Sequence, residues 1–139
     1  MSQQTSYLVG LKERYGGPVR ATAIGVAAGM KAAVEFYLGK QSLHGLKVAI
    51  QGVGKVGSNL CQILSQEGIE LFVSDIIPAR VEKMNRLYQA NIVNVDEIYY
   101  LNVDIFSPCA LGSILNSCII PKLQANIIAG SANNQLEDE

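Results

Sequence analysis

The segment that decides the fold is Gln51-Gly52-Val53-Gly54-Lys55-Val56-Gly57. It follows the apolar run 46–50 and precedes a helix-like pattern over 58–66, and a second apolar run over 69–73 then leads to Asp75. A strand, a Gly-x-Gly-x-x-Gly turn, a helix, a second strand and an acidic residue occur in this order in dinucleotide-binding βαβ units. We therefore predict a nucleotide site at residues 52–57.

Each glycine of this segment has its own predicted task. Gly52 lets the chain turn out of the strand, Gly54 lets a pyrophosphate approach the backbone, and Gly57 lets the helix pack closely on the sheet. The helix start then offers unpaired N–H groups and a positive dipole end to the phosphates. The alternative interpretation is an ordinary strand-to-helix turn, but the flanking strands and the acid favour a nucleotide.

Asp75 bears on the identity of the nucleotide. It lies 18 residues after Gly57, close to the spacing of about 20 expected for the acid that binds the adenosine ribose. A carboxylate there binds both ribose hydroxyls of NAD and repels the 2′-phosphate of NADP. Arg80 would favour NADP, but the position of Asp75 at the strand end predicts NAD. Lys55 is predicted to add a positive charge near the pyrophosphate, or else to be a solvent-exposed lysine.

Strand-like and helix-like segments alternate along the chain. Predicted strands cover 47–51, 70–74, 91–94, 103–106 and 126–129, and predicted helices cover 23–38, 55–66 and 78–88, with Thr22 as the N-cap of the first and a single turn at 96–99. This order predicts an α/β fold of the Rossmann type, with a doubly wound, mostly parallel sheet and helices on both faces. We divide the chain into a lead-in segment, 1–21, and one nucleotide-binding domain, 22–139.

Composition narrows the class of protein. The chain has 139 residues, which suggests one domain, and 49% of them are hydrophobic, which is enough for a core. The formal net charge of −1 does not suggest binding to nucleic acid or to an anionic membrane. The three cysteines and the single histidine, His44, predict neither a metal site nor a disulfide framework; Cys61 is expected in the core. No apolar run of about 18 residues and no signal peptide is recognised, which predicts a cytoplasmic protein.

Four loops should lie together, because ligands of an open parallel sheet bind beyond the carboxyl ends of its strands. These loops are 52–57, 75–78, 107–112 and 129–135. Small residues in the last loop would let a flat ring approach, and its amides would bond a carboxamide. Ordinary turn chemistry is the alternative, since glycine, serine and asparagine dominate turns.

Segments in a characteristic order resemble a known family. They are Thr22–Val26, the glycine segment with Asp75, Asp104–Gly112 and Ile128–Leu136. Together they resemble the cofactor-binding domain of the Glu/Leu/Phe/Val amino-acid dehydrogenases, closest to leucine dehydrogenase. The resemblance extends over nearly the whole chain. It implies NAD-dependent oxidative deamination of an L-amino acid such as leucine to its 2-oxo acid, and the reverse reaction.

The resemblance also implies positions around the cofactor. Thr22 would contact the nicotinamide side; Gly52, Gly54, Lys55 and Val56 would face the pyrophosphate, with Gly57 closing the same turn; Asp75 and Ile76 would hold the adenosine; Cys109 and Ala110 would lie between adenosine and nicotinamide; and Ala129, Ser131 and Asn134 would border the nicotinamide and the substrate amine.

The catalytic lysines and aspartate of the family lie in a preceding domain, and Gly16-Gly17-Pro18 lacks the lysine of the corresponding glycine-rich segment. The resemblance therefore implies a truncated enzyme that lacks its catalytic domain: no catalytic residue is assigned to this chain, and the isolated chain is not expected to turn over amino acids. Alternatives are a non-catalytic NAD-binding regulatory module and a partner protein that has lost its ligand. Self-association through the helix at 23–38 would give a homo-oligomer.

Overall fold

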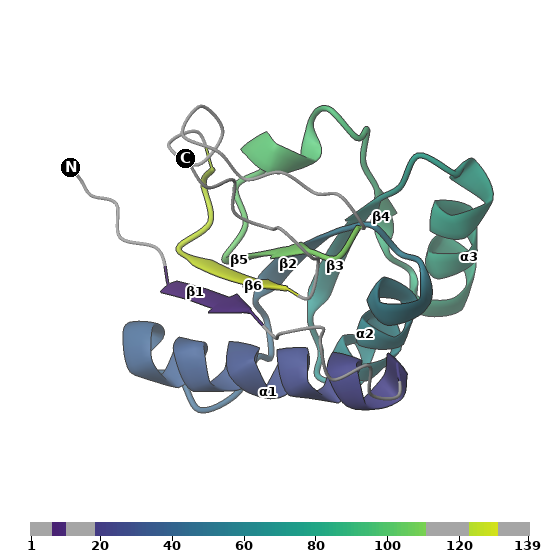
Figure 1. The fold of residues 1–139 in the computed structure, drawn as a ribbon. Helices are drawn as coiled ribbons and strands as arrows, with labels where there is room; N and C mark the ends of the chain where they lie inside the picture. The colour runs from purple at the N-terminus through teal and green to yellow at the C-terminus, as the bar shows by residue number, and fades with distance from the viewer. Residues whose placement is uncertain (1–6, 11–18, 111–122, 131–139) are drawn as a thin grey trace.

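The computed structural model describes residues 7–10, 19–110 and 123–130 (Figure 1). The elements in chain order are β1 (Tyr7–Gly10), α1 (Val19–Leu38), β2 (Lys47–Gln51), α2 (Lys55–Ser65), β3 (Glu70–Ser74), α3 (Pro78–Tyr88), β4 (Asn91–Ile92), the 3₁₀ turn η2 (Ile98–Tyr100), β5 (Ile105–Pro108) and β6 (Ile127–Gly130).

The described strands form one parallel sheet of six strands in the order β1-β6-β5-β2-β3-β4. At its centre, Val48 of β2 is in register with Leu71 of β3 on one side and with Ile105 of β5 on the other. The chain first moves outward from β2 to β4 and then returns to β5 beyond β2. This reversal places a topological switch point between β2 and β5, where ligands of such sheets bind.

Alternate residues of the strands face two separate cores. On one face, Val48 and Ile50 of β2 pack with buried residues of α1, α2 and α3. On the other face, Ala49 of β2 packs with Ile98 of η2 and Phe106 of β5. Helical segments thus cover both faces, and the predicted Rossmann-type fold is confirmed; on the second face the described helical segment is the single turn η2.

Most of the predicted elements are confirmed, especially around the glycine segment. The strands β2 and β3 and the helix α3 have the predicted bounds, and α2 ends one residue before its predicted end. Pro78 is the first residue of α3, and Gln89, with a φ of 59°, ends it. The strands β5 and β6 end one or two residues later than predicted.

The beginning of the chain differs from the prediction. The helix α1 begins at Val19, so Thr22 lies within it and is not its N-cap. A strand that was not predicted, β1, lies within the segment taken as a lead-in and pairs with β6. A four-residue strand leaves little local pattern, and its pairing partner is more than 100 residues away in the sequence, which explains why the sequence did not reveal it.

The helix α1 has the length and composition of a membrane span, with 20 residues and a mean hydropathy of 1.2. Its side chains Ala23, Val26, Met30 and Val34 are nevertheless fully buried in the first core. The helix lies along α2 and the strands β1 and β6 (Figure 1). An apolar face packed on a sheet is typical of a core helix.

Two glycines hold the turn from β2 to α2. Gly52 has a φ of +96°, and a Cβ added there would lie 2.5 Å from the backbone of Ala110. A Cβ on Gly57 would collide with the carbonyl oxygen of Gly52. The structure thus confirms the tasks predicted for Gly52 and Gly57: a conformation that favours glycine, and close packing of the helix.

We expect the substitution Gly52→Ala to lower the free energy of unfolding by roughly 2–4 kcal/mol, because it adds an overlap with Ala110 and a left-handed φ for a residue with a Cβ. Gly54→Ala is the matched control, since a Cβ there would meet nothing closer than Arg80 Nη1 at 3.5 Å. Urea unfolding of the two variants measures the difference. Equal stability of both variants would contradict the packing seen at Gly52.

Candidate nucleotide-binding site

The carboxyl ends of four neighbouring strands meet along one edge of the sheet. The N–H of Cys109, after β5, donates to the carbonyl of Gln51 at the end of β2, at 2.8 Å. The N–H of Gly52 donates to the carbonyl of Ser74 at the end of β3, at 2.8 Å. At the end of β6, a Cβ on Gly130 would collide with the carbonyl oxygen of Pro108. The structure therefore brings together the described parts of all four predicted loops.

Gly54 lies between the end of β2 and the start of α2, beside Arg80 of α3. A Cβ on Gly54 would make only ordinary contacts, the nearest with Arg80 Nη1 at 3.5 Å, so packing within the described protein does not require a glycine here. Gly54 is also the N-cap of α2, and no side-chain hydrogen bond caps this helix. The first N–H groups of α2 therefore have no side-chain cap, and the helix dipole places a partial positive charge beside them.

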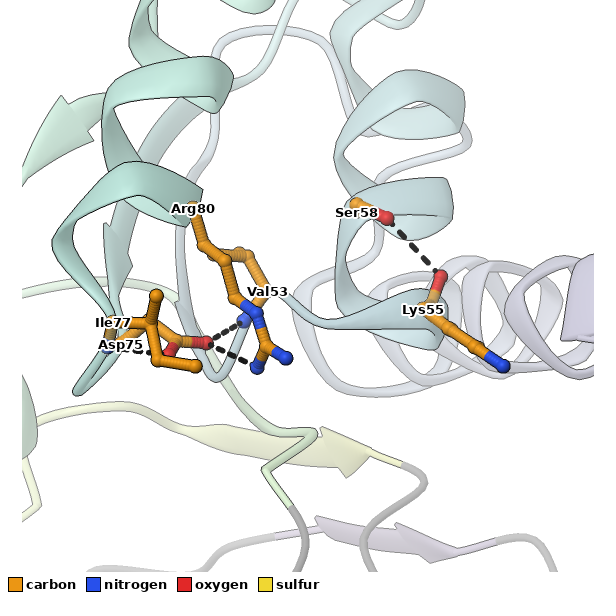
Figure 2. Close-up of polar contacts among 6 residues, drawn as sticks. All are labelled: Val53, Lys55, Ser58, Asp75, Ile77 and Arg80. Atoms are coloured by element: carbon orange, nitrogen blue, oxygen red, sulfur yellow. Dashed lines mark hydrogen bonds and ion pairs between the residues drawn. The ribbon is translucent and has the colours of Figure 1, made fainter.

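Asp75 is fixed beside the glycine turn (Figure 2). Its side chain is 5% exposed. Its Oδ2 accepts a hydrogen bond from the N–H of Val53 and its Oδ1 accepts one from the N–H of Ile77, both at 2.9 Å. Arg80 completes the arrangement, with Nη1 at 3.6 Å from Oδ2. Asp75 thus follows the last residue of β3, as predicted. Its negative charge is balanced by Arg80 and by the two backbone N–H groups.

Other predicted cofactor residues lie at different depths around this edge. Ile76 is 83% exposed beside Asp75, and Lys55 is exposed at the start of α2 with its side chain directed away from Asp75 (Figure 2). Val56, packed against the first core, and Ala110 are half-buried. These residues surround the part of the edge that is predicted to hold the adenosine and the pyrophosphate.

Two of the residues predicted on the nicotinamide side, Thr22 and Ala129, lie within the described structure. Ala129 is a fully buried core residue of β6, and Thr22 is half-buried within α1. Ser131 and Asn134 lie outside the described residues. The described structure therefore assembles the adenosine and pyrophosphate side of the predicted site.

Two cysteines lie near the glycine turn. The Sγ of Cys109 is 3.4 Å from the Oγ of Ser107, and a Cβ on Gly57 would lie 3.6 Å from Cys109 Cβ. Burial raises the pKa of the Cys61 thiol to about 12, with a smaller contribution from Cys109. The neutral, buried Cys61 is a core residue, as predicted, and is not a reactive nucleophile.

The sequence did not point to two of the contacts that shape the edge. The backbone N–H of Val53 holds Asp75, and no residue type signals a backbone donor. Gln51 Nε2 donates to the Oη of Tyr99 at 2.9 Å, which ties η2 to the end of β2. Burial raises the pKa of Tyr99, although the hydrogen bond from Gln51 opposes this change. A tyrosine in a predicted single turn gives no local signal of such a contact.

Known proteins are similar to this chain in sequence and fold. A family model described as Glutamate/Leucine/Phenylalanine/Valine dehydrogenase matches residues 16–76. An L-tryptophan dehydrogenase of Nostoc punctiforme is 56% identical over 139 residues, which are 100% of this chain and 39% of that protein. A leucine dehydrogenase of Geobacillus stearothermophilus is 45% identical over 139 residues, with 98% of this chain and 38% of that protein covered.

A solved structure gives the same result. The crystal structure of L-tryptophan dehydrogenase from Nostoc punctiforme matches with a TM-score of 0.84 and 56% identity, covering 88% of this chain and 37% of that chain. The chain therefore spans less than two fifths of the length of the relatives in these comparisons.

We expect Asp75→Asn to lower the free energy of unfolding by about 1–3 kcal/mol, because an amide has one acceptor oxygen and cannot accept from both the buried N–H of Val53 and the N–H of Ile77. Urea unfolding measures the change. Glu82→Gln, which removes the same charge from an exposed position of α3, is the control and should change stability by at most about 0.5 kcal/mol. Equal effects would show that the two hydrogen bonds to Asp75 do not stabilise the fold.

Proposed function

Because the chain belongs to the Glutamate/Leucine/Phenylalanine/Valine dehydrogenase family, we propose that it is the NAD-binding domain of an L-amino-acid dehydrogenase. The observation on which this proposal rests is the start of α2, where Gly54 is an N-cap without a side-chain hydrogen bond and a Cβ on Gly54 would make only an ordinary contact with Arg80 Nη1, at 3.5 Å. In a Rossmann fold, the backbone donors of a helix start at the switch point are where a pyrophosphate binds.

The phosphates are proposed to bind over residues 54–57. Gly52 and Gly57 are needed for the turn itself, whereas packing within the described residues does not require a glycine at position 54. The positive end of the α2 dipole favours the two negative charges of a pyrophosphate. Lys55, exposed at the first position of α2, adds a cation close to the same place.

The adenosine is proposed to bind between β3 and α3. Asp75 lies at the end of β3, and its two backbone hydrogen bonds leave further lone pairs on each oxygen that can accept from ribose hydroxyls. Ile76 presents an apolar side chain, 83% exposed, on which an adenine ring can pack. NAD fits this arrangement, since both ribose hydroxyls are donors.

In the intact enzyme we propose that the reaction is oxidative deamination of an L-amino acid, such as leucine, to its 2-oxo acid, and the reverse. Bound NAD supplies a hydride acceptor. The chain binds and orients the cofactor beyond the ends of β2, β3, β5 and β6. We assign no general acid or base to the described residues, and propose that the rest of the enzyme supplies these groups and the substrate pocket.

The exposed side chains of α1 bear on assembly. Phe36 is 77% exposed and Ile24 is 52% exposed. Apolar surface of this kind is often covered by another domain or subunit. We propose that the intact enzyme is a homo-oligomer.

Gly54→Asp should weaken NAD binding at least about tenfold, because the new carboxylate would lie beside the start of α2 and repel the pyrophosphate. Calorimetric and NMR titrations of the chain with NAD measure the affinity. Asn102 is exposed in the loop before β5, at the opposite edge of the sheet. The control variant Asn102→Asp adds the same charge there and should bind NAD with the affinity of the unmodified chain. Unchanged affinity in Gly54→Asp would show that this turn is not the phosphate site.

The isolated chain should not oxidise L-leucine with NAD, because we assign no described residue as the general base that takes the proton from the substrate amine. The measurement is NADH absorbance over time at high protein concentration, with a complete leucine dehydrogenase as the positive control. A rate above background that disappears in Gly54→Asp would show that this chain contains its own catalytic groups.

A further inference from the structure

Arg80 connects the two halves of the proposed cofactor site. Its Nη1 is 3.6 Å from Asp75 Oδ2, and the same atom is the nearest neighbour of a Cβ added to Gly54, at 3.5 Å. Figure 2 shows the guanidinium group of Arg80 beside Asp75 and Val53. One group from α3 therefore connects the acid with the glycine turn.

The exposed member of this ion pair is the cation. The Arg80 side chain is 48% exposed, whereas that of Asp75 is 5% exposed. Each oxygen of Asp75 also accepts a hydrogen bond from a backbone N–H. A ligand that approaches from solvent thus meets the guanidinium group, while the negative charge of Asp75 is buried and balanced.

The start of α3 adds to the positive potential around Arg80. The first turn of this 11-residue helix contains no acidic residue, and no side-chain hydrogen bond caps it. Arg80 is held in this turn by a hydrogen bond from its N–H to the carbonyl of Ile77 at 3.0 Å. The dipole of α3 and the charge of Arg80 therefore favour an anion at the same place.

We propose that Arg80 allows this site to accept a 2′-phosphate on the adenosine ribose, so that the chain binds NADP as well as NAD. This inference rests on the proposed dinucleotide function. An acid at the end of the second strand normally repels a 2′-phosphate. Here the repulsion is offset by Arg80, whose planar group can form two parallel hydrogen bonds to phosphate oxygens.

The test compares two probes that differ by the 2′-phosphate: adenosine 5′-monophosphate and adenosine 2′,5′-bisphosphate. NMR titrations give both affinities for the chain and for Arg80→Gln. The unmodified chain should bind the bisphosphate at least as tightly as the monophosphate. Arg80→Gln should weaken bisphosphate binding about tenfold or more, as expected for loss of a charge-assisted contact, and should change monophosphate binding less.

Two further variants serve as controls. Arg86→Gln removes the same charge from the last turn of the same helix and should leave the ratio of the two affinities unchanged. Arg80→Lys keeps the charge without the planar group and should retain part of the preference for the bisphosphate. If Arg80→Gln does not fold, the comparison of Arg80→Lys with the unmodified chain still tests the inference.

The possible failures are distinguishable. If the chain binds the monophosphate but excludes the bisphosphate, or if the Arg80 variants leave the ratio of affinities unchanged, the inference about Arg80 is overturned and the dinucleotide function stands. If the unmodified chain binds neither probe, the proposed function itself is overturned, and the inference with it.

Discussion

The close approach of α2 to the carboxyl end of β2 is the constraint on which the rest of this structure depends. Gly57 lies against the carbonyl of Gly52, and Gly52 in turn lies against Ala110. No larger side chain fits these contacts without a shift of the backbone. This packing aims the start of α2 at the edge of the sheet and brings the loop after β5 to the glycine turn. The position of Gly54 at the start of α2 follows from these two contacts.

Charge is arranged around the turn in a way that separates structural from binding roles. Asp75 is the negative group of the site, yet its carboxylate is nearly buried and helps to hold Val53, the residue between Gly52 and Gly54. Arg80 and Lys55 present their charges to solvent. The start of α2 adds a partial positive charge. The surface that a ligand meets is therefore more positive than the net charge of −1 suggests.

The predictions from sequence succeeded where the local pattern is dense. The glycine spacing, the two apolar runs beside it and Pro78 identified β2, α2, β3 and α3 with nearly the observed bounds. They also identified the turn and its acid. They did not find β1, because its four residues are defined by pairing with β6 at the far end of the chain. They also began α1 too late. The nicotinamide-side residues Ser131 and Asn134 remain predictions.

The sequence by itself determined the fold class and the turn that can hold a phosphate, because both depend on short-range features: hydrophobic periodicity and glycines at fixed spacing. Tertiary structure alone decided how the charges of the site are paired. Asp75 and Arg80 are five residues apart in the sequence, and nothing in their order shows that the carboxylate is buried while the guanidinium group is exposed and lies over Gly54. Burial and distance arise from the packing of β3, α3 and the glycine turn, and they determine the charge that the proposed nucleotide would meet.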